Sequence, residues 1–219
     1  MKINAGALTS LLYGNNMERV VKDSVTDIKK LDIPSDSAVI INMNTINGYF
    51  REGAICTPRL EKAAPKILKV NQHFSDSYKI FFIDRHEMQS PELSDYPVHC
   101  TSERERQVIA PLREYATKSN TFFKNSTNAF LTRKYAKWLS ANAKNINAFI
   151  ITGGMSDISV LQFALTQKAY FNNINRSNVK IAVIANATQT YDSPTHAGDL
   201  MHNFALYNMF LNGIIIANI

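Results

Sequence analysis

The chain has 219 residues, of which 45% are hydrophobic and 19% charged, which is enough for one sizeable core and one folded domain. Its two cysteines have no paired spacing, which argues against a disulfide scaffold and favours the reducing cytoplasm. No run of about 18 apolar residues and no secretory leader is visible, so no membrane association is expected. The net charge of +6 comes from scattered lysines and arginines, which argues against nucleic-acid binding.

Apolar residues at helical spacing predict an N-terminal helical extension over residues 1–35, chiefly across 16–30, ahead of a domain spanning 36–219. Strands are expected at 38–43, 78–83, 121–124, 149–151, 179–184 and 213–217. Helices are expected at 58–74 with a kink or restart at Pro65, at 103–110, at 130–139, directly after 149–154, and at 196–211. This alternation predicts an α/β fold: a three-layer sandwich whose parallel sheet of about six strands carries helices on both faces.

Residues 149–165 predict a strand that turns into a helix through a glycine pair. Such an elbow directs the first backbone N–H groups of the helix into the crevice at the carboxyl end of the sheet, where they can hold an anion or an oxyanion. Ser159, in the first helical turn, is placed where a catalytic nucleophile is often found. The alternative is that Ser156, Asp157 and Ser159 only cap the helix.

Asp84, His86 and His99 form a candidate metal site. Residues two apart on an extended segment share one side of the chain, so Asp84 and His86 can reach one ion, and His99 can return to it from the following loop. Glu92 lies between them as a candidate fourth ligand. Imidazoles combined with carboxylates suit Zn, Fe or Mn better than Ca or Mg. The alternative is an ordinary polar loop.

Lys124 ends a short apolar strand and precedes a polar run, residues 125–128. A buried lysine there can orient a nucleophile or stabilise developing negative charge. The alternative is a side chain that extends to solvent. Asn44, Asp84, Lys124 and the glycine elbow all follow predicted strands, so we expect them to lie at the carboxyl edge of the sheet.

Five stretches in a fixed order resemble the isochorismatase-like cysteine hydrolases, and among them the nicotinamidase-like branch. They are the run NTINGY from Asn44, the loop 84–100, the run KNSTNAF from Lys124, the elbow TGGMSDISV from Thr152, and Asp192 with His196 and His202. Each motif alone is weak, but five in the right order are specific. The resemblance covers roughly residues 36–217 and implies the Rossmann-like fold of this family.

The resemblance implies an Asp–Lys–Cys triad that hydrolyses a small amide through a thioester. Asn44, Lys124 and Ser159 stand at those three positions, so two of the three residues are replaced. It also implies an oxyanion hole formed by the N–H groups of Met155 and Ser159, after a cis peptide bond between Gly154 and Met155.

The same resemblance implies a divalent metal that meets a nitrogen atom of the substrate. The ligands would be Asp84, His86, Glu92 and His99. By analogy with relatives, a homo-oligomer is also expected.

An amide side chain cannot take up the proton that a carboxylate accepts, and serine is a weaker nucleophile than a thiolate. The leading prediction is therefore a catalytically degenerate member that keeps a pocket for a small amide or aromatic ligand, together with the metal site. One alternative is an active amidohydrolase in which a neutral Lys124 activates Ser159. Another is an enzyme whose aspartate and cysteine were replaced by engineering.

Overall fold

The structure is a computed structural model that describes residues 16–219. Its centre is a sheet of seven parallel strands in the order β1-β7-β6-β5-β2-β3-β4. The strands are β1 Thr26–Asp27, β2 Ala38–Met43, β3 Tyr78–Asp84, β4 Thr121–Lys124, β5 Ala148–Gly153, β6 Lys180–Thr188 and β7 Ile215–Asn218. The expected α/β fold is confirmed, with one strand more than the six expected.

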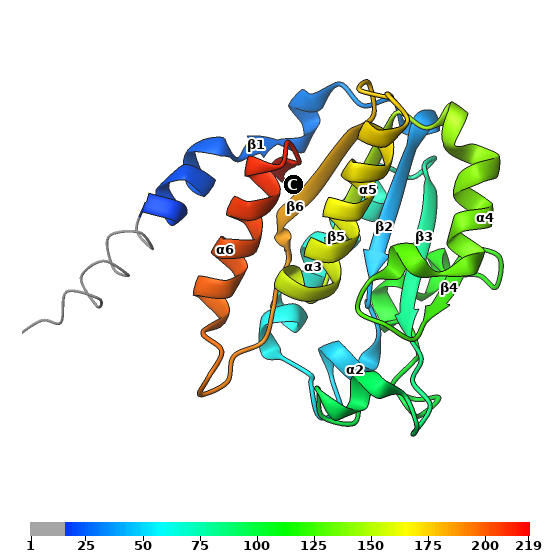
Figure 1. Cartoon of the computed structure of the whole chain (residues 1–219), viewed down its shortest axis with the longest axis vertical. Coiled ribbons are helices and arrows are strands. Elements are labelled where there is room, and N and C mark those ends of the chain that lie inside the picture. The colour runs from blue at the N-terminus through cyan, green and yellow to red at the C-terminus, as the bar shows by residue number, and fades with distance from the viewer. Residues whose placement is uncertain (1–15) are drawn as a thin grey trace, which may run out of the picture.

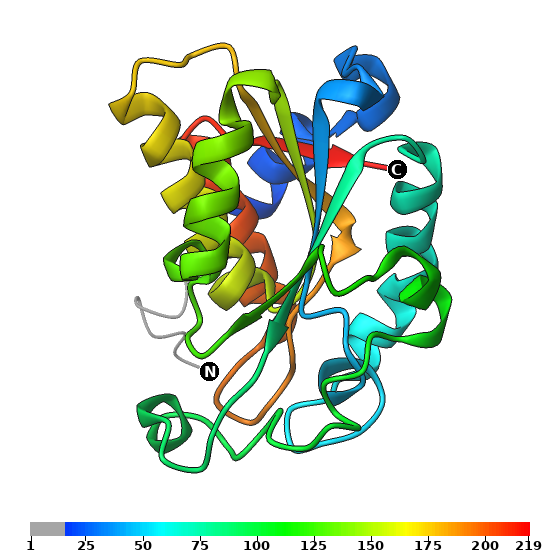
Figure 2. The same cartoon turned by 90° about the vertical axis from the view of Figure 1, so that its right-hand side faces the viewer.

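Helices cover both faces of the sheet (Figure 1). They are residues 16–24, α2 Asn47–Phe50, α3 Pro58–His73, α4 Arg133–Asn142, α5 Leu161–Asn173 and α6 Gly198–Leu211. Seen along the sheet, α4, α5 and α6 lie on one side and α3 lies on the other (Figure 2). Each face of the sheet therefore buries a core of its own, which makes the three-layer sandwich.

The central strand β2 contributes to both cores. All six of its residues are buried. Successive side chains of a strand point to opposite faces, so Val39 and Ile41 pack under α4, α5 and α6, whereas Ala38 and Ile40 pack on the side of α3. A largely apolar run of this kind is typical of a parallel strand that helices cover on both faces of the sheet.

The strand order reverses at β2. Strands β3 and β4 follow on one side of it, and β5, β6 and β7 follow on the other. In parallel α/β sheets, a ligand crevice forms at such a reversal, outside the carboxyl ends of the strands. Asn44 directly follows β2, Asp84 ends β3 and Lys124 ends β4. The fold therefore places all three residues at this crevice.

The N-terminal helix is shorter than its apolar spacing predicts. It ends at residue 24, because Thr26–Asp27 pairs with β7 as a short edge strand. A strand of two residues is too short to show an alternating pattern. The first part of the expected extension, residues 1–15, lies outside the described residues. Within residues 16–219, no helix combines the length and the apolar character needed to cross a bilayer.

The helix expected at 103–110 is wrong. The segment forms turns whose carbonyl groups bond to another part of the chain: Glu105 accepts from the backbone N–H of Gly48, and Gln107 accepts from that of Asn47, both at 2.9 Å. Carbonyl groups used in this way are not available for the bonds of a helix.

Of the kink or restart expected at Pro65, the restart is wrong, since α3 runs through this residue without interruption, and the kink stays a prediction. Pro65 leaves the carbonyl group of Glu61 without its helical donor. Both residues are exposed, so water can bond to that carbonyl group.

Candidate functional site

β5 ends in the tight elbow that the glycine pair predicts. Gly153 has a φ of 102°, and a Cβ atom there would lie 2.0 Å from the carbonyl oxygen of Met43, so only glycine fits. The peptide bond between Gly154 and Met155 is cis. A π-helical turn, Ser156–Val160, then leads into α5.

The side chains of Ser156 and Asp157 do not cap this turn. The Ser156 hydroxyl group is hydrogen-bonded to Nδ1 of His202 at 3.0 Å. The Asp157 carboxylate lies 2.7 Å from Nε2 of His196. Because partners elsewhere in the described chain take both groups, the interpretation of these residues as helix caps is wrong.

Three donors surround the buried carboxylate of Asp84. Lys124 forms an ion pair with Oδ1. Nδ2 of Asn44 donates to Oδ2 at 2.8 Å, and the Tyr49 hydroxyl group donates to the same oxygen. Burial and the charge of Asp84 raise the pKa of Tyr49, so its hydroxyl group keeps the proton that it donates. The structure thus brings Asn44, Asp84 and Lys124 into one network.

Ser159 faces two donors. Nδ2 of Asn44 and Nζ of Lys124 each lie 3.5 Å from its hydroxyl oxygen. Asn44 must turn its nitrogen toward Asp84, because a carboxylate only accepts hydrogen bonds. Both lone pairs of the Ser159 oxygen therefore face hydrogen atoms. Among residues 16–219, no side chain accepts the proton of this hydroxyl group.

Lys124 has three acceptors for its three N–H bonds. They are the Asp84 carboxylate, the backbone carbonyl oxygen of Ser126 at 3.0 Å, and the Ser159 hydroxyl oxygen. An ammonium group has three hydrogens and no lone pair. The match indicates that Lys124 is protonated, and in this state it cannot act as a base.

The four expected metal ligands are neighbours. The rings of His86 and His99 lie 4.6 Å apart. One ligand atom from each of Asp84, His86 and His99 lies within 4.8 Å of the others. Oε1 of Glu92 lies 3.8 Å from Nε2 of His86.

Hydrogen bonds at Nδ1 orient both imidazole rings. Nδ1 of His86 lies 3.0 Å from Oδ1 of Asn125, and Nδ1 of His99 lies 2.7 Å from the carbonyl oxygen of Pro97. Since these oxygens accept, each Nδ1 donates, and in a neutral ring Nε2 is then the nitrogen with the lone pair. Nε2 of His86 is buried and has no hydrogen-bond partner among residues 16–219. Burial lowers the pKa of His99, which favours its neutral form. These residues fit a metal of the Zn, Fe or Mn class.

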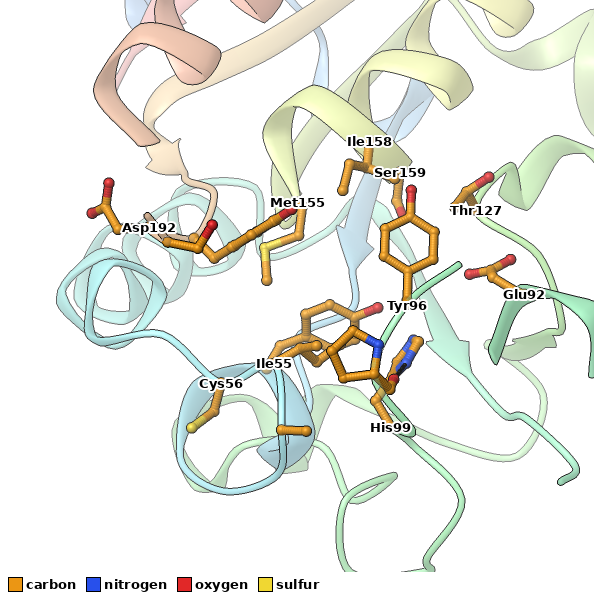
Figure 3. A pocket seen from close by; sticks show the side chains of 15 residues that line it. Ile55, Cys56, Glu92, Tyr96, His99, Thr127, Met155, Ile158, Ser159 and Asp192 are labelled. Carbon is orange, nitrogen blue, oxygen red and sulfur yellow. Dashed lines mark hydrogen bonds between the residues drawn. The ribbon is translucent and has the colours of Figure 1, made fainter. Parts of the chain in front are cut away.

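A cavity of about 220 Å³ opens over Ser159. Ser159 and Ile158 of the elbow border it on one side, and Ile55 and His99 on the opposite side (Figure 3). Its walls are mostly aromatic and apolar, with a few polar groups, and include Tyr49, Ala54, Ile55, Tyr96, Met155, Ile158, Tyr191, Glu92, Thr127 and Asp192. This composition is typical of a small-molecule site. Met155 and Ser159 both line the cavity, and their role as an oxyanion hole stays a prediction.

Sequence reasoning missed two tyrosines of this site. Tyr49 belongs to the run NTINGY, which indicated the position of Asn44 but not that a hydroxyl group from α2 reaches Asp84. Tyr191 stacks on the ring of His196 with centroids 3.9 Å apart, and its carbonyl oxygen lies 2.9 Å from Nδ1 of that histidine. Tyr191 and Asp157 are far apart in the chain, so no spacing could point to their link through His196.

A family model described as the isochorismatase domain matches residues 38–217. Solved structures share the fold. Pyrazinamidase/nicotinamidase from Streptococcus mutans is 21% identical, with a TM-score of 0.67, and the match covers 82% of this chain and 99% of that one. N-carbamoylsarcosine amidase from Thermoplasma acidophilum is 19% identical, with a TM-score of 0.65 and coverages of 83% and 96%. A cysteine hydrolase from Pseudomonas syringae is 13% identical, with a TM-score of 0.69 and coverages of 85% and 90%. A search among curated proteins finds no match.

Proposed function

Since the chain belongs to the isochorismatase family of hydrolases, we propose that it binds a small amide or aromatic molecule without hydrolysing it. The observation that carries the proposal is the environment of Ser159, whose hydroxyl oxygen faces the donors of Asn44 and Lys124 at 3.5 Å each. A serine becomes a nucleophile only when a neighbouring base removes its proton. Both neighbours here supply hydrogen atoms instead.

The loss of a carboxylate at position 44 weighs heavily on catalysis. In the serine-protease triad, exchanging the aspartate for asparagine lowers kcat about 10⁴-fold, although that aspartate only orients a histidine. A carboxylate at position 44 would itself take the proton, so its loss should lower kcat by at least as large a factor. Asn44 cannot replace it, because its Nδ2 points to Asp84 and Ser159.

The arrangement suits binding. The free hydroxyl proton of Ser159 can be donated to a carbonyl or carboxylate oxygen of a ligand. Tyr96, Tyr191 and Ile158 offer apolar and aromatic surface around a small planar molecule. The cavity thus combines few polar groups with mostly apolar walls, as small-ligand sites do.

A divalent metal of the Zn, Fe or Mn class belongs to the same proposal. His86 and His99 would bind it through Nε2, and Asp84 and Glu92 through carboxylate oxygens. The unpartnered Nε2 of His86 supports this assignment. When bound, the metal would supply Lewis-acid chemistry at this end of the cavity.

The second candidate is an active amidohydrolase that uses Ser159 with Lys124. The 3.5 Å distance between Nζ and Oγ favours it, because a neutral lysine at that place could take the serine proton. The ion pair with Asp84 opposes it, since it holds Lys124 in the charged form. An engineered origin of Asn44 and Ser159 is a further alternative, and the coding sequence of the natural gene decides it.

The test compares three proteins for ammonia release from nicotinamide and a panel of small amides, with and without Zn²⁺, Fe²⁺ or Mn²⁺. We expect no turnover by the unchanged chain or by Ser159→Ala, and measurable turnover by the Asn44→Asp, Ser159→Cys double variant. We expect the unchanged chain to bind nicotinamide even though it does not hydrolyse it. Isothermal titration calorimetry measures this binding. Turnover by the unchanged chain that is lost in Ser159→Ala would establish a serine amidase instead.

We further propose a cytoplasmic homo-oligomer, by analogy with the family. Light scattering after size-exclusion chromatography measures the assembly directly. A monomer across the micromolar range contradicts it.

A further inference from the structure

The cavity over Ser159 has an acidic lining, although the chain as a whole is basic. The net charge of the chain is +6. Glu92 and Asp192 both line the cavity, whereas none of the described residues that line it is a lysine or an arginine. A cleft lined by charges of one sign concentrates ligands of the opposite sign. The lining therefore disfavours anionic ligands and favours cationic ones.

Glu92 supplies the negative charge that a ligand would meet. Asp192 is paired with Arg59, whose Nη1 lies 3.1 Å from Oδ2 of the carboxylate. Glu92 is 12% exposed, and within residues 16–219 no lysine or arginine forms an ion pair with it. The nearest basic nitrogen is Nε2 of His86, which lies 3.8 Å away, beyond hydrogen-bond distance. A largely buried carboxylate without a cationic partner is weakly screened, so it attracts a cation strongly.

Aromatic rings line the cavity near this carboxylate. The rings of Tyr49 and Tyr96 both stand nearly perpendicular to that of His99, with centroids 6.1 Å and 6.4 Å away. Figure 3 shows Tyr96 between Ser159 and His99, with Glu92 beside it. Burial, and to a smaller extent the negative charge of Glu92, raises the pKa of Tyr96, as expected for close neighbours. The face of an aromatic ring attracts a cation, and most strongly in a desolvated site.

We propose that the cavity selects a ligand that carries a positive charge, namely a small cationic ring with a carboxamide group, such as a pyridinium carboxamide. The carbonyl oxygen of the ligand accepts from the Ser159 hydroxyl group, and its charge faces Glu92 and Tyr96. The inference rests on the proposed function, because it names the class of small molecule that the pocket binds. It does not require the metal, which would compete with the cation for Glu92.

The test compares three probes that share one ring: 1-methylnicotinamide as the cation, nicotinamide as the neutral molecule and nicotinate as the anion. Their binding to the full chain is measured by isothermal titration calorimetry at neutral pH. EDTA is present, because a metal would engage Glu92. We expect the cation to bind at least about tenfold more tightly than nicotinamide, and nicotinate to bind at least about tenfold more weakly.

Variants locate the source of this preference. Glu92→Gln keeps the size of the side chain but removes its charge, so the advantage of the cation over nicotinamide should fall to less than about threefold. The matched control is Glu87→Gln, an exposed glutamate of the same loop that does not line the cavity, and it should keep the tenfold advantage. Tyr96→Phe should keep the preference, whereas Tyr96→Leu should reduce it several-fold by removing the ring. Circular dichroism checks that each variant folds.

Three outcomes would overturn the inference. If nicotinamide binds and the cation binds no more tightly, the pocket of the proposed function stands but its charge selectivity is absent. If Glu87→Gln lowers the advantage as much as Glu92→Gln does, the preference comes from the overall charge of the protein and not from the cavity. If none of the three probes binds, the proposed function fails together with the inference. If Glu92→Gln does not fold, the two Tyr96 variants decide, and equal preferences in both would contradict the role of the ring.

Discussion

Lys124 donates a hydrogen bond to the hydroxyl oxygen of Ser159 across 3.5 Å. The direction of this bond matters, because a base in this position would have to accept it. The ion pair with Asp84 fixes the direction by keeping the lysine charged. A thiol at position 159 would therefore lie beside a cation, and a neighbouring cation lowers the pKa of a thiol.

We predict that the thiol of the Ser159→Cys variant reacts with iodoacetamide faster at pH 7 than an ordinary cysteine does. The measurement uses a background with Cys56→Ser, because Cys56 is exposed, whereas Cys100 is buried and burial raises its pKa. Adding Lys124→Met should slow the alkylation several-fold by removing the cation. An unchanged rate in that variant would mean that Lys124 carries no charge at the site.

The ion pair between Lys124 and Asp84 yields a stability prediction. Both side chains are about 1% exposed. Removing one partner of such a pair leaves an unpaired buried charge, which costs about 3–5 kcal/mol. We expect Lys124→Met to lower the free energy of unfolding by that amount in urea titrations. The double variant Lys124→Met, Asp84→Asn should be more stable than the single variant, because no buried charge is left unpaired. If the double variant loses the sum of the unfolding free energies lost by the two single variants, the two residues are not coupled.

The sequence predicted the strands well because their residues interact mainly with the sheet itself. The run AVIINM predicts β2 with the bounds that the structure has, and TFFK does the same for β4. The expected strand at 179–184 continues to Thr188, where the apolar signal is diluted by Asn186 and small residues. β1 was missed since its two residues become a strand only through pairing with β7.

The candidate site was predictable only to the level of residue positions. The predicted strand ends indicated which side chains reach the crevice. The family resemblance indicated which of the motifs along the chain belong to the site. Neither gave the direction of hydrogen bonds, and that direction decides the chemistry of Ser159. The partners of Ser156 and Asp157 were not predictable either, because His202 and His196 are brought to the elbow by packing of α6 and the loop before it.

Buried His202 yields a prediction about pH. Burial, and to a smaller extent the charge of Arg59, lowers its pKa from 6.5 to about 4. Between these values the unfolded chain binds a proton that the native protein does not, so stability rises with pH in this window. The contribution is fully present above pH 6.5 and is lost as the pH falls to about 4. At about 1.4 kcal/mol for each pH unit, the loss amounts to about 3 kcal/mol.

The measurement is the free energy of unfolding in urea at several pH values from 4 to 7. The control is His202→Asn, which can still accept a hydrogen bond from Ser156 but does not titrate in this range. Its curve should be flatter than that of the unchanged chain by about 3 kcal/mol over the window. Parallel curves for the two proteins would contradict the lowered pKa.

Tyr191 forms part of the cavity wall, and contacts with His196 hold it in position. Nδ1 of this histidine lies 2.9 Å from the carbonyl oxygen of Tyr191, and Nε2 lies 2.7 Å from the Asp157 carboxylate. Its ring stacks on that of Tyr191. One side chain therefore ties the loop that carries Tyr191 to the elbow that carries Ser159. We predict that His196→Leu loosens this loop, because it removes both hydrogen bonds and leaves Asp157 buried without its partner.

Hydrogen exchange measured by mass spectrometry on peptides covering 189–197 tests this prediction. We expect exchange at least about tenfold faster in His196→Leu, since the backbone bonds between Ser193 and His196 open with the loop. Peptides from β2 should exchange as before. His73→Leu is the matched control, because His73 is an exposed histidine at the end of α3. Unchanged exchange in the loop, or equal acceleration in both variants, would mean that Tyr191 is held by the surrounding packing and not by His196.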